Sequence, residues 1–581
     1  MVTKVAEPGL GELLAERRKS RNLYWAVGLF SVFANLLMLT GPIYMLQVYD
    51  RVLVSGSIAT LVALTALVAF LYGIMALLDH ARAQVMARVG ARFQTGLDRR
   101  VFEATLQRAA RRSGDDVAVN GLRDLEAVQR LMSSPVVMAL FDMPWVPLFL
   151  LGIALFHPWL GYLALCGGAV LVLLTLASQI ATRRALTQTH EAQASVDALA
   201  SQFQTEAEMV KALGMRDAAL ARWQQSRDGV LTGTLRVTDL SGRFAATSRA
   251  LRLFLQSAML GMGALLVIRG EVTPGAMIAA SILLGRALAP VEQAISGWPL
   301  VQRAMRGWAD LSQLLSDHPP DAARTPLPPP RARLEVHNLA VVPPGESQAV
   351  LRSLNFTLAP GQALGVIGPS GAGKSVLARA LTGSWPPAGG KIRLDGASLD
   401  QYDPKARGRH IGYLPQRVYL FDGTIAENIA RMSLIPDPAG VVDAARKAGA
   451  HEMILKLPDG YDTRVTHAGG RLSGGQIQRI GLARAIYGDP VILILDEPDA
   501  NLDTAGSLAL NRAIRAMKAE GKSVLIMAHR PAAIQECDMI LVIEAGRGVA
   551  FGPRNEVLQK VLSNHDAVQA GLAWGSGGAV R

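Results

Sequence analysis

The sequence contains little cysteine and little charge, and each shortage excludes a class of protein. Its 581 residues include two cysteines, which excludes a disulfide-stapled scaffold and a four-cysteine metal site. Only 18% of the residues are charged, below the roughly 25% that is usual in soluble globular proteins. Half are hydrophobic, which excludes a disordered chain. The net charge of +12 then leaves a nucleic-acid-binding protein or a membrane protein with basic cytoplasmic loops.

Long apolar runs lie between residues 23 and 292. A membrane-spanning helix needs roughly 20 apolar residues. The sequence therefore predicts six spans, with a kink in the first at Gly41-Pro42. The first run is too long for the apolar core of a signal peptide, and no small-residue cleavage site follows it. The predicted spans are Leu23–Gln47, Ile58–Leu78, Pro135–Phe156, Trp159–Ala177, Leu253–Ile268 and Val272–Val291.

Charge is distributed unequally over the connections between these spans. The two long loops, 79–133 and 179–251, hold ten and nine Lys and Arg residues, and the three short loops hold two. The positive-inside rule therefore places the long loops and the basic N-terminus in the cytoplasm. Both long loops lack proline and have helical patterning, so we expect helices that continue the spans. A separate soluble helical subdomain is the alternative. This topology accounts for most of the positive charge without nucleic acid.

The composition changes after the last span, where a proline-rich segment leads into an ordinary α/β pattern. We expect five regions along the chain: an N-terminal cytoplasmic segment, a six-helix membrane domain with cytoplasmic extensions, a linker, an α/β domain and a flexible glycine-rich tail. Their respective boundaries are residues 1–22, 23–317, 318–331, 332–568 and 569–581.

A phosphate-binding loop follows the apolar strand predicted at Ala363–Ile367 and precedes a helix predicted from Val376. Its glycines allow backbone N–H groups to approach phosphates, Lys374 supplies a positive charge to the β- and γ-phosphates, and Ser375 offers a hydroxyl to Mg²⁺. The loop consists of Gly368, Pro369, Ser370, Gly371, Ala372, Gly373, Lys374 and Ser375.

Three polar residues end two further apolar runs. The run Val491–Leu495 is followed by Asp496, a candidate Mg²⁺ ligand, and by Glu497, a candidate general base for the attacking water. The run Ser523–Ala528 is followed by His529. Parallel strands bind ligands at their carboxyl ends, so we expect His529 to contact the γ-phosphate. A structural histidine is the alternative.

A short segment between these motifs, Leu472–Gln476, precedes a helix predicted at Ile477–Tyr487. Helix N-termini bind anions, so this segment is a second candidate phosphate site. A simple loop is the alternative for any Ser-Gly-Gly stretch taken alone. The order of all these motifs along the chain is much more specific than any one of them.

This set of motifs resembles the ATP-binding cassette (ABC) transporters. The resemblance implies a six-span α-helical exporter domain joined to an α/β P-loop ATPase domain, the ABC nucleotide-binding domain, with ATP and Mg²⁺ bound. It also implies that two copies are required, because the signature motif caps the nucleotide bound to the opposite subunit. In that family Gln416 is a catalytic glutamine that contacts Mg²⁺ and water, and Asp503 in Ala500–Asp503 contacts the partner subunit. The signature residues are Ser473, Gly474, Gly475 and Gln476.

The resemblance extends over about residues 20–565 and favours one subgroup, the type I secretion permease/ATPases of the PrtD-like protease exporters. Members export unfolded proteins across the bacterial inner membrane, often glycine-rich calcium-binding-repeat proteins. They work with a periplasmic adaptor (membrane fusion protein) and an outer-membrane tunnel protein. The stretches that carry this resemblance are Gly41–Arg51, Phe141–Trp145, Arg379–Pro387, Gly408–Gln416 and Leu420–Asn428.

Three positions depart from the family pattern. Ala340–Gly345 has no aromatic residue where ABC proteins usually stack the adenine. Thr466-His467 stands before the signature where exporters often have Gly-Glu, and Arg417 follows Gln416 where an acidic residue is expected. None of these positions is predicted to touch the phosphates.

Three other functions are alternatives to protein export. An exporter of lipids or small peptides would use the same ATPase. A soluble ATPase for DNA repair or chromosome structure would need a long coiled coil between P-loop and signature, and the sequence has no room for one. A catalytically inactive ATP-binding regulator is disfavoured because Glu497 and His529 are both present.

Arg286 lies inside the sixth predicted span. A charged residue at the bilayer centre costs about 2.5–3.5 kcal/mol on insertion scales. Two placements follow: the side chain lines a polar lumen, or it extends toward the cytoplasmic edge of the membrane.

Overall fold

The computed structural model describes residues 8–111, 120–320, 324–466, 472–500, 502–528 and 534–560. The chain divides into two compact units. The helical unit comprises residues 1–109 and 114–320, and the α/β unit comprises residues 110–113 and 321–581. His529, the middle of the predicted linker and the predicted tail lie outside the described residues.

The helical unit contains six segments that are long and apolar enough to cross a membrane, as the sequence predicts. They are Arg21–Ser55, Ile58–Ala110, Pro135–Phe156, Pro158–Thr205, Arg216–Ile268 and Pro274–Ser296. The first segment combines several short helices, and the third combines two helices with a short turn between them. The helices are α1 (Pro8–Lys19), α2 (Arg21–Leu37), α3 (Thr40–Gln47), α4 (Leu53–Ser55), α5 (Ile58–Arg111), α6 (Asn120–Met132), α7 (Pro135–Asp142), α8 (Val146–Phe156), α9 (Pro158–Thr205), α10 (Ala207–Ala212), α11 (Arg216–Ile268), α12 (Pro274–Ser296) and α13 (Trp298–Asp317).

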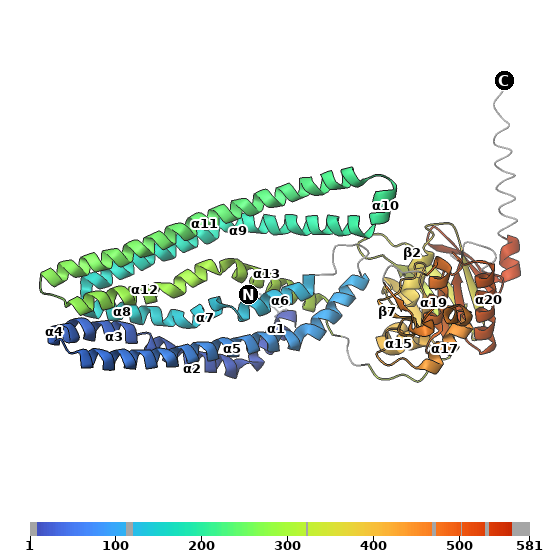
Figure 1. Ribbon diagram of the computed structural model, residues 1–581. Coiled ribbons are helices and arrows are strands. Elements are labelled where there is room, and N and C mark those ends of the chain that lie inside the picture. Colours follow the sequence, from blue (N-terminus) through green and yellow to red (C-terminus); the bar gives the residue numbers. More distant parts are fainter. Residues whose placement is uncertain are drawn as a thin grey trace, which may run out of the picture. The chain divides into compact units, whose positions relative to one another are not determined.

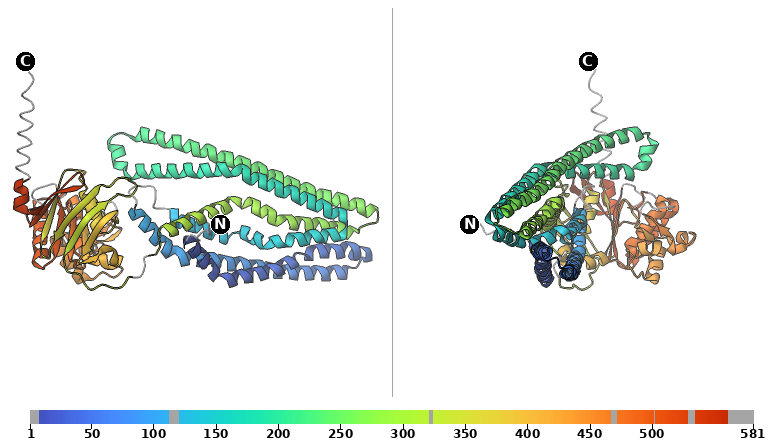
Figure 2. Two further views of the ribbon diagram at one scale, coloured as in Figure 1. Left: turned by 180° about the vertical axis from the view of Figure 1, so that it is seen from behind. Right: turned by 60° about the vertical axis from the view of Figure 1, so that its left-hand side comes forward.

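Three of these helices are far longer than a bilayer requires. Helix α5 has 54 residues, α9 has 48 and α11 has 53. Helices α9 and α11 lie side by side as a hairpin closed by the short helix α10, and the hairpin separates from the other helices toward α10 (Figures 1 and 2). The chain is therefore helical through the long loop 179–251, and α5 continues helical well into the other.

The first span is interrupted just before the predicted kink. Helix α2 ends at Leu37 and α3 begins at Thr40, so Met38 and Leu39 form a turn. Pro42 explains the position, because proline has no N–H to donate to the carbonyl four residues earlier, that of Met38. A π-helical turn at Val48–Val52 then follows α3.

Helix α1 packs against the other helices, a feature that the sequence did not predict. Its fully buried Leu13 joins a core with Phe93 of α5, Leu125 of α6 and Leu311 of α13. The backbone N–H of Gly9 donates to Ser316 Oγ at 3.0 Å. The predicted N-terminal segment is therefore an ordered part of the helical unit from residue 8 onward.

The same region contains a carboxyl group with a strongly shifted pKa. Burial and the neighbouring Asp310 raise the pKa of Asp124 on α6 to about 7, although Arg303 and Arg108 act in the opposite direction. A carboxyl group whose pKa is raised in the folded state contributes its full stabilisation when the pH is below its unfolded pKa of about 4. This contribution to the free energy of unfolding is lost as the pH rises to about 7.

We therefore expect Asp124→Asn to raise the melting temperature of the detergent-purified protein more at pH 8 than at pH 5. Asp239→Asn is a suitable control, because Asp239 is exposed on α11. An equal shift for Asp124→Asn at both pH values would contradict the assignment.

The α/β unit is built on a six-stranded sheet with the order β12-β11-β3-β10-β9-β6, in which only β12 is antiparallel to its neighbour. A four-stranded antiparallel sheet, β2-β1-β4-β5, and the pair β7-β8 accompany it. The strands are β1 (Leu334–Val341), β2 (Leu351–Leu358), β3 (Ala363–Ile367), β4 (Gly389–Leu394), β5 (Ala397–Ser398), β6 (Ile411–Leu414), β7 (Gly423–Thr424), β8 (Arg464–Val465), β9 (Ile492–Asp496), β10 (Ser523–Met527), β11 (Met539–Glu544) and β12 (Arg547–Pro553).

Both faces of the six-stranded sheet are covered, as continuous apolar strands require. On β9, Ile492 and Ile494 belong to the core shared with α14 and the antiparallel sheet, and Leu493 and Leu495 to the core shared with α17, α19 and α20. The helices are α14 (Lys374–Leu381), α15 (Pro404–His410), α16 (Ile425–Ile429), α17 (Pro438–Lys447), α18 (His451–Leu455), α19 (Gly474–Ile486) and α20 (Thr504–Ala519). Figure 2 shows the strands of this unit from the side opposite Figure 1.

Asn428 connects α16 to the preceding loop and to α19. Its side chain is fully buried, donates to the carbonyls of Phe421 and Thr424, and accepts from the Phe421 N–H and the Arg484 guanidinium. Each buried group left unsatisfied costs about 1–3 kcal/mol.

We therefore expect Asn428→Ala to lower the free energy of unfolding of the α/β unit by at least about 2 kcal/mol. The measurement is chemical denaturation of the full-length protein followed by the loss of ATP binding. Asn511→Ala on α20 is the control, because no side-chain hydrogen bond of Asn511 is seen within the described part of the chain. Similar midpoints for the two variants would show that the Asn428 network contributes little.

Candidate functional site

The predicted phosphate-site residues gather at the carboxyl ends of neighbouring parallel strands. The P-loop follows β3, Asp496 ends β9 and Gln416 follows β6. The intervening strand β10 lies between β3 and β9 and leads to His529, which is outside the described residues. The sheet order thus brings three segments that are far apart in the sequence to one edge.

The P-loop needs glycine at two positions for its path. Gly371 and Gly373 have φ values of 80° and 101°, which side-chain-bearing residues rarely adopt. A Cβ on Gly373 would also lie 2.7 Å from Leu351 Cδ2. The loop then enters α14 at Lys374, two residues before the predicted start, so its backbone leads directly into a helix N-terminus that favours anions.

Lys374 is almost completely buried for a lysine. Its ammonium group donates to the Gly368 carbonyl at 2.8 Å and to the Pro369 carbonyl at 3.0 Å. Burial lowers the pKa of Lys374, and the nearby carboxylates of Glu497 and Asp496 act in the opposite direction. The loop carbonyls and two acidic groups thus compensate for the burial of this cation.

Ser375 and Asp496 meet across the edge of the sheet. The Ser375 hydroxyl donates to Asp496 Oδ1 at 3.2 Å, and Asp496 is only 2% exposed. Burial raises the pKa of Asp496, while the hydrogen bond from Ser375 lowers it and the adjacent Glu497 raises it. A cation bound here would favour the ionised carboxylate.

Glu497 is held next to Gln416 by an unusual backbone conformation. The Gln416 amide donates to Glu497 Oε2 at 2.9 Å. Glu497 has a φ of 49°, and its N–H donates to the Met527 carbonyl at 3.0 Å. A non-glycine residue in this region is strained, and such strain concentrates at functional sites.

The signature segment is organised as a helix cap. Ser473 Oγ accepts from the Gln476 N–H at 3.3 Å, and Gln476 Oε1 accepts from the Ser473 N–H at 2.8 Å, which forms a reciprocal capping box for α19. Within the described residues, no hydrogen bond or ion pair joins Ser473 or Gln476 to the P-loop of the same chain. No direct bond therefore joins these two predicted phosphate sites within the described part of one copy.

Two further residues near the site make hydrogen bonds that position α19 and α20. The buried Gln478 on α19 donates to the Pro498 carbonyl at 3.3 Å, directly after Glu497. Asp503 caps α20 by accepting from the Gly506 N–H at 2.7 Å, while its side chain remains at the surface. Sequence reasoning missed Gln478, because an amide on a helix shows no pattern that reveals its distant acceptor.

The helical unit holds a buried polar cluster between three of its long segments, which the sequence analysis also missed. Asp142 of α7 accepts from Arg82 of α5 at 2.8 Å and from Asn35 of α2 at 2.7 Å, and all three residues are buried. Arg286 of α12 lines the adjacent cavity of about 380 Å³ together with these residues and Gln293. Because this cavity is also lined by Arg82 and Ser133 of the predicted loop 79–133, both predicted placements of Arg286 stay predictions.

Comparisons with known proteins agree with this architecture. Residues 24–289 match the ABC transporter transmembrane region, and residues 351–500 match the ABC transporter family. The type I secretion system ATP-binding protein PrsD of Rhizobium meliloti is 42% identical to the chain over 548 residues, which cover 94% of each protein. The chain belongs to the ABC transporter family. In this ABC transporter the α/β unit is an ATPase, and ATP hydrolysis there is coupled to transport.

Other relatives of this ABC transporter also carry names from protein export. The cyclolysin secretion/processing ATP-binding protein CyaB of Bordetella pertussis is 29% identical over 96% of this chain and 79% of its own length. The leukotoxin translocation ATP-binding protein LktB of Mannheimia haemolytica is 28% identical over 93% and 77%. A solved bacterial Atm1-family ABC exporter with ATP bound has a TM-score of 0.79 at 23% identity, over 97% of this chain and 99% of that one, and shows the shared fold.

Proposed function

We propose that this ABC transporter exports unfolded proteins as the ATP-driven component of a type I secretion system. The observation that carries the proposal is the 42% identity to a type I secretion ATP-binding protein over nearly the whole of both chains. Relatives named for cyclolysin and leukotoxin export support a protein cargo over a lipid or a small peptide. Glycine-rich calcium-binding-repeat proteins are the cargo class that the sequence resemblance suggests.

The proposed working form is a homodimer. Ser473–Gln476 has no bond to the P-loop of its own chain within the described residues, so a partner's P-loop is the natural site for it to complete. Asp503 at the surface before α20 is the proposed contact with the second copy. Each dimer would then contain two composite ATP sites.

The site chemistry can be assigned residue by residue under this proposal. Glu497 accepts a proton from the attacking water, and Gln416 orients both the water and the Glu497 carboxylate to which it is bonded. Lys374 and the N–H groups of the P-loop bind the phosphate oxygens. His529 is proposed to contact the γ-phosphate.

The oxygen donors present fit Mg²⁺. Ser375, Gln416 and Asp496 offer a hydroxyl, an amide oxygen and a carboxylate, and Mg²⁺ favours such hard ligands together with substrate phosphates. Bound Mg²⁺ would neutralise charge on the β- and γ-phosphates. The hydrogen bond between Ser375 and Asp496 keeps two of these donors close together.

We propose that the transporter lies in the bacterial inner membrane with its N-terminus and ATPase unit in the cytoplasm, as the charge of the long loops favours. The proposed partners are a periplasmic adaptor and an outer-membrane tunnel protein. The proposed domain boundaries remain 23–317 for the membrane domain and 332–568 for the ATPase domain.

The test compares proteins in the culture medium of cells with the gene, without it, and with the gene carrying Glu497→Gln. One or a few proteins should disappear from the medium in both defective strains and return with the intact gene. The proposal would be overturned if the proteins in the medium were the same in all strains while the export of membrane lipids or peptides changed.

Arg286 provides a further prediction for the membrane half. Arg286→Leu should strongly reduce secretion and leave basal ATP hydrolysis intact, because the polar cavity lies in the helical unit and the hydrolytic residues lie in the α/β unit. Arg269→Leu, in the short connection after α11, is the matched control. Normal secretion by Arg286→Leu would show that this residue does not contribute to transport of the exported protein.

A further inference from the structure

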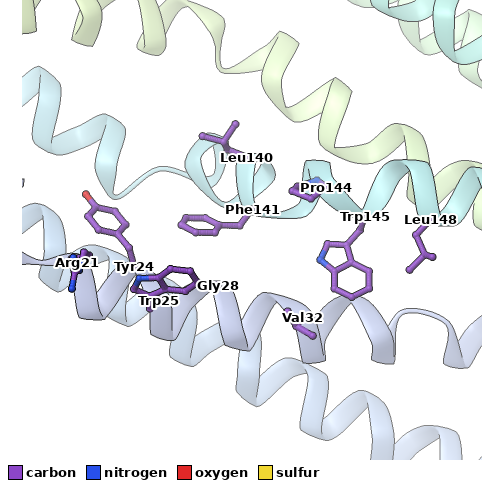
Figure 3. A pocket seen from close by; sticks show the side chains of 10 residues that line it. All are labelled: Arg21, Tyr24, Trp25, Gly28, Val32, Leu140, Phe141, Pro144, Trp145 and Leu148. Carbon is purple, nitrogen blue, oxygen red and sulfur yellow. The ribbon is translucent and has the colours of Figure 1, made fainter. Parts of the chain in front are cut away.

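An apolar groove opens between α2 and the segment α7–α8 of the helical unit. Figure 3 shows aromatic and aliphatic side chains from the two segments facing each other across it. The groove has a volume of about 810 Å³, and its walls are mostly apolar. Trp25 remains 74% exposed there, so the chain itself leaves this surface uncovered. The lining residues are Arg21, Tyr24, Trp25, Gly28, Val32, Leu140, Phe141, Pro144, Trp145 and Leu148.

One end of the groove is positively charged. Arg21 is the first residue of α2, and it has no ion-pair partner among the residues that the structure describes. The exposed residues Arg17, Arg18 and Lys19 precede it in the last turn of α1. Lys19 is paired with Glu16 at 2.7 Å, which leaves most of the local positive charge uncompensated. The groove thus combines an apolar body with a cationic end.

The length of the groove matches one leaflet of a bilayer. From Arg21 to Val32 the helix rises by roughly 17 Å at 1.5 Å per residue, about half of the 30 Å hydrocarbon thickness. On the proposed orientation, Arg21 lies at the cytoplasmic face. The cytoplasmic leaflet is the one with a negative surface potential.

We propose that this groove binds one anionic phospholipid of the cytoplasmic leaflet. Its phosphate pairs with Arg21, and an acyl chain lies against Trp25, Phe141 and Trp145. The same groove of a second copy fits less well, since two grooves facing each other would bring two Arg21 side chains together.

Gly28 allows a direct test of occupancy. A Cβ added at Gly28 would meet nothing within 4 Å, so a side chain can enter the groove from this position, and Gly28→Leu places an isobutyl group there. Gly73 on α5 is equally open and does not line the groove, which makes Gly73→Leu the matched control.

The experiment uses the full-length dimer in nanodiscs of phosphatidylcholine with or without phosphatidylglycerol, followed by native mass spectrometry of retained lipids. The intact protein and Gly73→Leu should retain phosphatidylglycerol, and Gly28→Leu should retain roughly tenfold less. Arg21→Gln should lose the preference for phosphatidylglycerol over phosphatidylcholine, since a charge-assisted contact is removed.

Two results would overturn the proposal. One is equal phosphatidylglycerol retention by Gly28→Leu and the intact protein. The other is conversion of the Gly28→Leu dimer to monomers, which would identify the groove as a protein interface. Neither result depends on the identity of the exported cargo, so the proposed export function is tested separately.

Discussion

Glu497→Gln is expected to reduce ATP hydrolysis by about 10²–10⁴-fold, the usual contribution of a general base, while ATP binding persists. The substitution keeps the size of the side chain and its contact with Gln416, but an amide cannot accept the proton of the attacking water. Because bound ATP would no longer be hydrolysed, the variant should also accumulate as a dimer in which ATP holds the two ATPase units together. Single-turnover hydrolysis and binding of a fluorescent ATP analogue measure the two effects separately.

The control for this variant is Glu452→Gln, which removes an exposed carboxylate on α18 of the same unit. It should hydrolyse ATP at the normal rate. If Glu497→Gln retained turnover within about tenfold of the intact protein, the general-base assignment would be wrong, because that loss falls below the range expected for such a base.

Ser473→Arg is the second variant with a large expected effect, and it should abolish hydrolysis through the partner's site. A bulky cation would occupy the N-terminus of α19, where the proposed partner nucleotide is bound. Loss of the Ser473 cap alone costs only about 1 kcal/mol, so the unit should remain folded. Thr424→Ala, which removes the analogous cap of α16, controls for cap loss and should keep its activity.

Mixed dimers distinguish a composite site from a site within one chain. When Ser473→Arg is on one copy and Lys374→Ala on the other, both defects fall in the same composite site and the second site is intact. When both substitutions are on one copy, each composite site carries one defect. Hydrolysis should therefore survive only in the first dimer, and the reverse pattern would show that each chain builds its own site.

The sequence predicted the arrangement of the phosphate site well because its motifs are local. The P-loop and Asp496 were each predicted after an apolar strand, and parallel strands share an edge, so the pattern places Ser375 and Asp496 near one another. Gln416 came from the family resemblance, and the structure places it at the same edge, after β6. The same reasoning located six spans, since apolar length alone decides them. Helix starts were less accurate, and α14 and α19 begin two and three residues earlier than expected.

Long-range polar contacts could not be predicted in this way. The docking of α1 depends on Leu13, which resembles any other leucine on a short helix. The strained φ of Glu497 depends on the path of the chain after β9 and on its bond to Met527. Asp50, which accepts from the Thr273 hydroxyl and the Gly275 N–H, caps the N-terminus of α12 from a distant segment. Such pairings arise only when the fold brings the segments together.

The buried cluster of Arg82, Asp142 and Asn35 has a consequence for biogenesis. A carboxylate costs about 2.5–3.5 kcal/mol at the centre of a lone span facing lipid and less toward its ends, and Asp142 is the eighth of the 22 residues of its span. In the folded protein Arg82 and Asn35 neutralise and bond it, and they come from the two preceding spans. Packing beside the first two spans therefore lowers the cost of placing the third span in the bilayer, which favours assembly of these three helices as a group.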